Sequence, residues 1–574
     1  MRAVVVALAL TSLIACGDDL RGDDITIVTP LAWSPALTEF AALTPAAITV
    51  RTDQAESTSD FQIILVDDAA IPLEGFRIEP DGTGIWRVHT HDVLGAQYGA
   101  AAALENLGIR FRHPFDTYVP ALGQDAIINA EGVTHQPEVR VRGFQLHTLH
   151  PLEGYFAFWE PGPGNASDAR RTIDWLIKNR GNFLQWVALD DINDPAVHEK
   201  WKAHTRALLD YAHARGIRVG LNIQLFGQSN LQYAFDLSDD RSGTIPLADE
   251  IAARLPLVVT DLPFDVYALS FGEFFNAESQ KFIDSVNEVQ RQLATLAPAA
   301  EMHGVVHVGE EQRITFMGED LIYYFLVKFA SPAIIPDIHT VMYYNLFEDA
   351  GGAYHHANFT EHLDYLESRM CADQKAAYFP ETAYWVAFDN SVPQWNPLYV
   401  RSRWLDLHTL KQRPCWPLDE HLIFSSGWEW GFWLNDVTAL RGSYTVPDQV
   451  TTLLTDALPA DTAAATAQVI DAQHEALIVK RLAAYLAGRD IAIDSGDVAG
   501  IVSQPDRITF ADLVASADPA FGTTVMAPLA TYADALDAIA LPARADRWAA
   551  EVVDGLAIDR VRARFVLETY GAVL

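Results

Sequence analysis

The chain of 574 residues is short of basic residues, of cysteine and of long apolar runs. It holds 40 lysines and arginines against 76 aspartates and glutamates, so its formal net charge is −36 at pH 7. Proteins that bind nucleic acid need a basic surface, and this balance excludes nucleic acid as a partner. No stretch beyond the N-terminal segment approaches the roughly 18 uncharged apolar residues that a membrane span needs.

The first of only three cysteines closes the short apolar segment at the N-terminus. Residues 1–15 hold one basic residue and then an apolar run too short to span a bilayer, which is typical of a secretory signal peptide. The string LIAC, which ends at Cys16, resembles the lipobox of bacterial lipoproteins and implies an acyl chain such as palmitate on Cys16. An ordinary secretory signal that ends near a cysteine is the alternative. Residues 16–24 would be a polar tether, and we expect the protein in the bacterial cell envelope, on its periplasmic or surface face.

Three regions follow the expected tether. Residues 25–130 alternate strand-like runs with one clear helix and predict a small α/β accessory domain. Residues 138–446 alternate short β-rich runs with long amphipathic helices, as successive βα units around a parallel sheet do. Eight strands with seven or eight helices predict a (β/α)8 TIM barrel. Residues 447–574 are rich in alanine and predict a helical domain.

The barrel prediction places the strand starts and the two other cysteines. The eight strands should begin near Val139, Phe183, Ile217, Phe264, Met302, Ile338, Ala376 and Leu422. Cys371 would end the helix before the seventh strand, and Cys415 lies just before the eighth, so both fall in adjacent loops on the N-terminal face. A disulfide is reasonable there in an oxidising compartment, and two unpaired thiols are the alternative.

Carboxylates concentrate where the catalytic groups of a TIM barrel lie, at the C-terminal ends of the strands. Five expected strands end in acidic residues: Glu273, Glu310 and Glu311, Glu348 and Asp349, Glu381, and Glu429. Cleavage of a glycosidic bond needs one carboxylic acid to protonate the leaving oxygen and a second carboxylate to attack or to activate water. We therefore predict a glycoside hydrolase, with Glu273, Glu381 and Asp349 as its catalytic residues.

Aromatic residues support a carbohydrate substrate. Seven of the fourteen tryptophans lie between Trp385 and Trp433, and three of them surround Glu429. Flat indole rings with polar neighbours are suited to the apolar faces of sugars. The expected substrate-binding residues are Arg142, His147, Glu310, Asn345, Trp385, Trp428 and Glu429.

Two strings resemble known glycosidases. The segment DVLGAQYGAAAALENLGIRFRHP from Asp92 resembles the accessory domain that precedes the barrel in β-hexosaminidases and α-glucuronidases. The string VRGFQLHT resembles the first barrel strand of β-hexosaminidases, which implies that Arg142 binds sugar hydroxyls. Those enzymes have an Asp-Glu pair on strand four, where this chain has Gly272 and Glu273. The acid is thus kept without the polarising aspartate, which argues against acetamide-assisted hydrolysis.

The layout of accessory domain, barrel and helical domain is closest to the α-glucuronidases of glycoside hydrolase family 67. This resemblance implies Glu273 as the acid, with Asp349 or Glu381 available to activate water. A uronate would also call for basic groups, for which Arg142, Arg313 and His147 are the candidates. Direct attack by Glu381 would retain the anomeric configuration and water activation would invert it, and the sequence leaves both open.

Two other functions are compatible with the sequence. One is a non-catalytic carbohydrate-binding lipoprotein on a degenerate barrel, because fold alone does not establish function. The other is a metal-dependent hydrolase, because His147 and His150 end the first strand while His303 and His307 share one face of the fifth. A helical HExxH motif is absent, and we expect no metal and no cofactor. The oligomeric state is left open.

Overall fold

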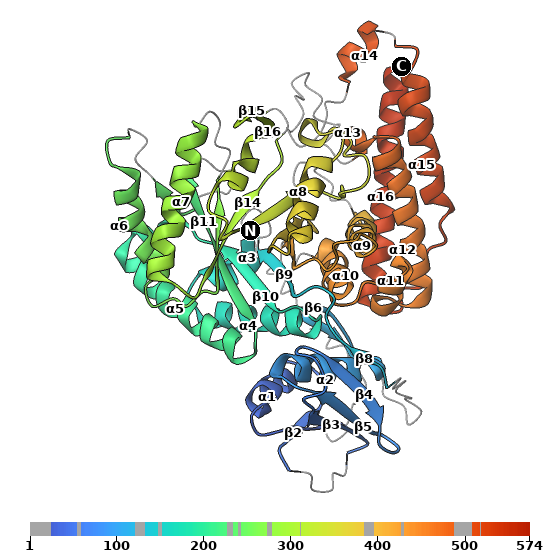
Figure 1. The fold of residues 1–574 in the computed structure, drawn as a ribbon. Helices are drawn as coiled ribbons and strands as arrows, with labels where there is room; N and C mark the ends of the chain where they lie inside the picture. Colours follow the sequence, from blue (N-terminus) through green and yellow to red (C-terminus); the bar gives the residue numbers. More distant parts are fainter. Residues whose placement is uncertain are drawn as a thin grey trace, which may run out of the picture.

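The computed structural model confirms the predicted fold class. An α/β domain, a closed barrel and a set of long helices follow one another along the chain (Figure 1). The described residues are 25–53, 59–120, 132–146, 152–226, 234–238, 243–271, 278–309, 312–383, 395–425, 430–486, 508–516 and 518–574. The expected signal peptide and Cys16 lie outside them. Within the described residues, no helix has the length and apolarity that crossing a membrane requires.

The N-terminal domain is a six-stranded sheet in the order β2-β1-β3-β5-β4-β8. Strand β8 pairs with β4, so the domain extends a few residues beyond the expected boundary at 130. Its elements are β1 Ile25–Val28, α1 Ser34–Ala42, β2 Ile48–Arg51, β3 Phe61–Asp67, β4 Phe76–Pro80, β5 Ile85–Thr90, α2 Val93–Asn106, β6 Arg110–His113, β7 Asp116–Tyr118 and β8 Thr134–His135.

Helix α2 contains the YGA string and lies between this sheet and the barrel (Figure 1). Asp92 caps its N-terminus by accepting the Gly95 N–H at 2.6 Å. A Cβ on Gly99 would come within 2.3 Å of Val88 on β5, so only glycine permits this close approach. On the barrel side, the Tyr98 hydroxyl donates to the carbonyl of Gly181 at 2.8 Å. The string therefore fits the helix between two packed surfaces.

Eight parallel strands close the barrel. Strand β9 pairs with β19 on one side and with β10 on the other, and β10 pairs with β11. The barrel strands are β9 Val141–Leu146, β10 Phe183–Val187, β11 Arg218–Phe226, β13 Val266–Ser270, β14 Glu301–Val306, β17 Ile334–Thr340, β18 Ala377–Pro380 and β19 Glu420–Ser425. All eight expected strands are present. The sixth begins at Ile334, four residues before the expected start at Ile338, because the whole buried run IIPDIHT forms the strand.

Among the described residues, seven α-helices surround the barrel, and a 3-10 helix, η2 (Tyr323–Phe329), stands where an eighth would follow β14. They are α4 Pro163–Lys178, α5 Pro195–Ala214, α6 Leu247–Val259, α7 Ser279–Leu296, α8 Thr360–Cys371, α9 Leu398–Lys411 and α10 Trp433–Tyr444. Shorter elements of the same region are α3 Leu152–Trp159, η1 Asp190–Asn193, β12 Asp236–Ser238, β15 Arg313–Phe316, β16 Glu319–Ile322, η3 Ala353–His355 and η5 Trp430–Phe432.

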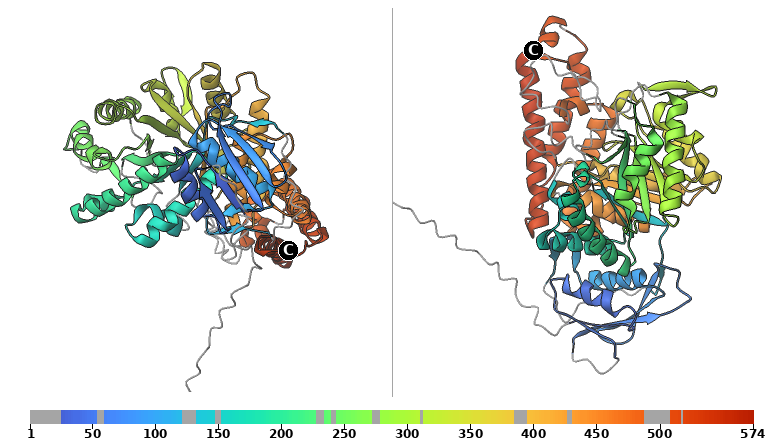
Figure 2. Two further views of the ribbon diagram at one scale, coloured as in Figure 1. Left: turned by 90° about the horizontal axis from the view of Figure 1, so that it is seen from below. Right: turned by 90° about the vertical axis from the view of Figure 1, so that its left-hand side faces the viewer.

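The C-terminal helices stand along one side of the barrel, while the N-terminal domain lies at one of its ends (Figure 2). The rings of Trp433 on α10 and Trp548 pack edge to face with centroids 4.4 Å apart. The elements are α11 Val450–Ala457, α12 Ala460–Gln473, η6 His474–Val479, α13 Ala483–Leu486, α14 Phe510–Ser516, η8 Gly522–Met526, α15 Ala527–Ala538 and α16 Arg547–Val573. These helices confirm the helical character expected of this part of the chain.

The structure joins Cys371 and Cys415 in a disulfide with the Cα atoms 4.9 Å apart. Cys371 is the last residue of α8, and Cys415 precedes β19. The bond thus ties the loops that lead into the last two barrel strands, and it encloses a sequence separation of 44 residues.

We predict that the double variant Cys371→Ala, Cys415→Ala is less stable by about 4 kcal/mol, because a loop of this length loses much entropy when it is closed in the unfolded chain. Urea unfolding followed by tryptophan fluorescence measures the shift. Dithiothreitol should lower the stability of the wild-type protein to that of the variant and leave the variant unchanged. Equal midpoints for both proteins in the absence of reductant would contradict the prediction.

Candidate active site

Glu381 lies at the C-terminal end of the barrel, directly after the last residue of β18. It continues the strand pairing by a parallel bridge to Phe424 on β19. The residue is only 3% exposed. Strand ends on this face form the active sites of TIM barrels, so Glu381 occupies the position that the sequence predicted for a catalytic carboxylate.

The two carboxyl oxygens of Glu381 have different surroundings. Oε2 accepts the backbone N–H of Met342 at 2.5 Å. Among the described residues, Oε1 has no hydrogen-bond partner, and the Nε2 atom of His339 lies 3.6 Å from it. One oxygen is therefore fixed by the backbone while the other is left for a further contact.

Burial raises the pKa of Glu381 to about 8, against the smaller lowering effects of the Met342 N–H and the Arg403 guanidinium. A carboxyl group in a dry site loses its hydration when it ionises, so the neutral form is favoured. Glu381 is therefore largely protonated at neutral pH, which suits a general acid better than a nucleophile.

His339 and His307 form the neighbouring wall at the ends of β17 and β14. Nδ1 of His339 lies 2.7 Å from the Phe379 carbonyl, which assigns the proton to Nδ1 and leaves Nε2 as the acceptor that faces Glu381. The two imidazole rings lie 4.9 Å apart. Burial lowers the pKa of His339 to about 4 and that of His307 to about 3, so both rings are neutral beside the carboxyl group.

Helix α9 holds the backbone on either side of the acid. Arg403 donates from Nη1 to the carbonyl of Glu381 at 2.9 Å and from Nη2 to the carbonyl of Tyr344. Asp406, one turn further along, accepts the N–H of Leu346 and the hydroxyl of Tyr378, both at 2.8 Å. The segment after β17 and the end of β18 are thus fastened to the same helix.

Helix α10 holds the next residue. Asp436 accepts the hydroxyls of Thr382 and Ser425, one on each carboxyl oxygen and both at 2.5 Å. Asn435 donates to the carbonyl of Thr382 at 3.0 Å. Burial raises the pKa of Asp436 to about 7, but its oxygens are occupied, so we assign it a positioning role.

Asp349 and Asn345 do not lie where the sequence suggested. Both follow β17 at a distance in a loop, because the strand ends at Thr340. Asp349 is paired with Arg481 and accepts the N–H of Gly351 at 2.7 Å. Asn345 is 1% exposed and accepts the N–H groups of Phe347 and Glu348 at 2.9 Å. We therefore correct both assignments from catalysis and substrate binding to structural roles.

The neighbouring Glu348 also ties this loop to other parts of the chain. It pairs with Arg401 on α9 at 2.6 Å and with His474 at 3.0 Å. Burial acts to raise its pKa, but hydrogen bonds from His474 and Arg401 outweigh burial and hold the pKa well below its usual range. Glu348 is therefore an ionised link between the barrel and the C-terminal helices.

Arg142 also requires correction. Its side chain is completely buried at the N-terminal end of β9, on the opposite side of the barrel from Glu381. It pairs with Glu74 of the N-terminal domain and donates to the carbonyls of Arg180 and Val139 at 2.9 and 2.7 Å. Arg142 therefore joins two domains and does not reach a substrate. The second basic candidate, Arg313, lies on β15 and pairs with Asp320 and Glu361.

Several expected site residues lie outside the described residues. They are Glu273, His147, Glu310, Trp385, Trp428 and Glu429. In the sequence each of them follows a barrel strand, and their roles stay predictions. The distance between the Glu273 and Glu381 carboxyl groups would distinguish retention from inversion. Because Glu273 lies outside the described residues, this distance stays undetermined.

Within the described part of the chain, one group has the spacing of metal ligands: Glu301, His303 and Glu420. Glu301 is already paired with Arg218 and Lys375. His303 lies 2.7 Å from Asp337, and two carboxylates raise its pKa to about 9 although burial acts to lower it. A metal at this place would have to displace the proton of the imidazole and break the ion pairs of Glu301. These residues do not support the metal-dependent alternative.

Sequence reasoning missed the groups that hold Glu381 in place. His339, Arg403 and Asp436 come from three different elements, and their relation to Glu381 depends on packing between those elements. A partial signal was present for Arg403 and Asp406, since a charged pair three residues apart on a buried helix usually has a buried partner.

No family model matches the chain, and no curated protein matches it either. Among solved structures, a GH138 enzyme targeting pectin rhamnogalacturonan II is similar over 96% of this chain and 86% of its own, with a TM-score of 0.58 at 14% identity. CpGH84B aligns over 96% of this chain and 88% of its own, with a TM-score of 0.49 at 10% identity. The chitobiase of Flavobacterium johnsoniae aligns over the same shares, with a TM-score of 0.46 at 12% identity.

The likeness to the GH138 enzyme shows that the two chains share their overall fold over nearly the whole length of this chain, and the TIM barrel is part of that fold. The layout of family 67 in particular is not shown by these comparisons and stays a hypothesis.

We predict that Glu381→Gln makes the protein more stable, and that the gain grows with pH. The raised pKa means that the folded state keeps a proton which the unfolded chain releases above about 4.5. The wild-type protein therefore loses stability as the pH rises from about 4.5 to about 8, by an amount on the order of 4 kcal/mol, whereas glutamine has no proton to lose.

Urea unfolding at pH 5 and pH 8 measures this difference. The exposed substitution Glu568→Gln on α16 is the control for the same change of side chain on the surface. If the stability difference between Glu381→Gln and the wild-type protein is the same at both pH values, Glu381 does not have a raised pKa.

Proposed function

We propose that this protein is a glycoside hydrolase that acts outside the cytoplasm on an oligo- or polysaccharide. The observation that carries the proposal is the buried Glu381 carboxyl at the C-terminal end of the barrel, with one oxygen fixed and a pKa raised to about 8. A neutral carboxylic acid at this place can protonate the oxygen of a departing sugar. The fold shared with a GH138 enzyme is consistent with this chemistry.

In this proposal Glu381 is the general acid and Glu273 supplies the second carboxylate. This differs from the family 67 resemblance, which implied the reverse assignment, because burial keeps Glu381 protonated. The neutral ring of His339 lies on one side of the acid and does not draw it into an ion pair, since a charged imidazolium would lower the pKa of the carboxyl group. Proton transfer from Glu381 leaves a carboxylate that accepts the Met342 N–H.

For the substrate we propose a plant or bacterial polysaccharide fragment, with an acidic sugar as the first class to test. The GH138 enzyme is described as targeting pectin rhamnogalacturonan II, and family 67 α-glucuronidases act on uronic acids. A lipid on Cys16 would place the enzyme at the cell envelope, where such fragments arrive. Mass spectrometry of the mature N-terminus tests the lipid directly.

We predict that Glu381→Gln lowers kcat by 10²- to 10⁴-fold on a hydrolysed glycan, because the general acid is removed while the shape of the site is kept. Aryl glucuronides, aryl galacturonides and pectin fragments form the first screen. Glu273→Gln should show a loss of the same order, and Glu568→Gln should retain full turnover. Binding of the glycan to Glu381→Gln without turnover by the wild-type protein would instead indicate a non-catalytic binding lipoprotein.

We also predict that kcat/KM of the wild-type protein falls about tenfold per pH unit above about pH 8, because the acid must carry its proton in the free enzyme. A pH–rate profile between pH 3 and 10 measures this decrease. The opposite result is a kcat/KM that rises with a midpoint near pH 4 to 5 and stays constant above neutral pH. It would show that Glu381 acts as an ionised nucleophile or base.

A further inference from the structure

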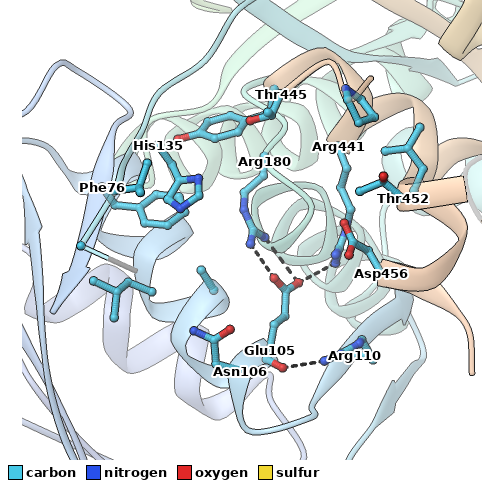
Figure 3. Close-up of a pocket in the computed structure, with 17 residues that line it drawn as sticks. Phe76, Glu105, Asn106, Arg110, His135, Arg180, Arg441, Thr445, Thr452 and Asp456 are labelled. Atoms are coloured by element: carbon cyan, nitrogen blue, oxygen red, sulfur yellow. Dashed lines mark hydrogen bonds and ion pairs between the residues drawn. The ribbon is translucent and has the colours of Figure 1, made fainter. Parts of the chain in front are cut away.

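A cavity lies at the other end of the barrel from Glu381, where the three parts of the chain meet. Its volume is about 580 Å³, which is within the usual range for sites that bind small molecules. It is lined by α2 and β4 of the N-terminal domain, by the turn before β10, by the end of α10 and by α11 (Figure 3). Nothing in the proposed hydrolysis uses it.

The centre of the cavity is a buried charge cluster. Arg180 and Arg441 approach the carboxylate of Glu105 from two sides (Figure 3). Burial acts to raise the pKa of Glu105, but the two guanidinium groups outweigh burial and lower it. Asn179 accepts from Nε of Arg441 at 2.9 Å, which fixes that side chain from behind. The wall is thus preorganised by contacts that do not need a ligand.

The lining of the cavity carries more positive than negative charge. The lining holds three arginines, the third being Arg110, against the two carboxylates Glu105 and Asp456. Arg110 donates from Nη1 to the carbonyls of Glu105 and Ile109 at 2.6 and 2.9 Å, and no described residue accepts from its Nη2. In a chain of net charge −36, a cavity with an excess of positive charge selects for an anionic group.

The other polar groups of the lining would reject a bare anion. Among the described residues, neither Asp456 nor Asn106 has a side-chain hydrogen bond, and Asp456 lies beside Arg441 (Figure 3). A carboxylate at this place repels an anion but accepts hydroxyl groups. The apolar side chains of Ile78, Val133 and Leu453 add a surface on which a ring can lie.

We propose that this cavity binds an acidic sugar, with the carboxylate of a uronate on Arg110 and its hydroxyls on Asp456 and Asn106. The lining joins a guanidinium donor, carboxylate and amide acceptors and an apolar face, which are the groups that a uronate ring can satisfy together. This proposal is independent of the chemistry at Glu381 and would stand even if the protein were not a hydrolase.

The test measures binding of D-glucuronate to the full chain by isothermal titration calorimetry, with D-glucose and acetate as the two comparison ligands. Thr452→Trp places an indole in the cavity, and Thr451→Trp, on the same exposed stretch of α11 but outside the lining, is its matched control. Thermal unfolding of both variants checks that they are equally folded. Asp456→Ala is a second, smaller change in the same wall.

We expect D-glucuronate to bind and D-glucose and acetate to bind at least tenfold more weakly. Thr452→Trp should abolish the binding and Thr451→Trp should leave it unchanged. Asp456→Ala should weaken glucuronate about tenfold, the loss expected for a hydrogen bond to a charged acceptor. The same substitution should strengthen acetate, because it removes a repelling charge.

Three results would overturn the proposal. Acetate that binds as tightly as glucuronate would show a simple anion site. Binding of glucuronate that survives Thr452→Trp would place the ligand elsewhere, for example at the mouth of the barrel. No binding of glucuronate to the wild-type protein would show that the cavity is only a junction between the domains. None of these results bears on turnover by Glu381.

Discussion

Closure of the barrel by the pairing of β9 with β19 is the constraint on which the rest of the structure depends. Residues Glu420–Ser425 pair in register with Val141–Leu146, although almost the whole barrel lies between them in the sequence. Parallel strands that close a ring must all end on the same side. Within this ring, β14, β17 and β18 are neighbours, and their pairing brings together His307, His339 and Glu381 at the ends of the three strands.

Closure of the barrel does not by itself raise the pKa of the Glu381 carboxyl group. A carboxyl group that loses its water must be held by other donors or stay protonated, and here only one oxygen has a strong donor, the Met342 N–H. Asp436 is the instructive contrast, since it is equally buried but has a hydroxyl on each oxygen. Its hydrogen bonds are complete, whereas among the described residues Oε1 of Glu381 has no hydrogen-bond partner.

The eight strands could be predicted because each barrel strand is a short apolar run separated from the next by a helix, a pattern that local sequence carries. Glu381 could be predicted for the same reason, as a carboxylate at a strand end. The roles of Arg142 and Asp349 could not, because their partners Glu74 and Arg481 lie in other parts of the chain. A charged residue near a strand looks the same in the sequence whether it faces a substrate or a neighbouring domain.

The corrected role of Arg142 explains why the N-terminal domain is held so firmly at the closed end of the barrel. Glu74 and three backbone carbonyls replace the water that the buried Arg142 guanidinium has lost. Separating the two domains would therefore leave a buried cation and a carboxylate without their partners. Glu105, with Arg180 and Arg441, repeats the arrangement a short way along the same junction. Two buried ion clusters fix the orientation of the domains, and a fixed orientation is what allows the cavity between them to keep a shape that a ligand can recognise.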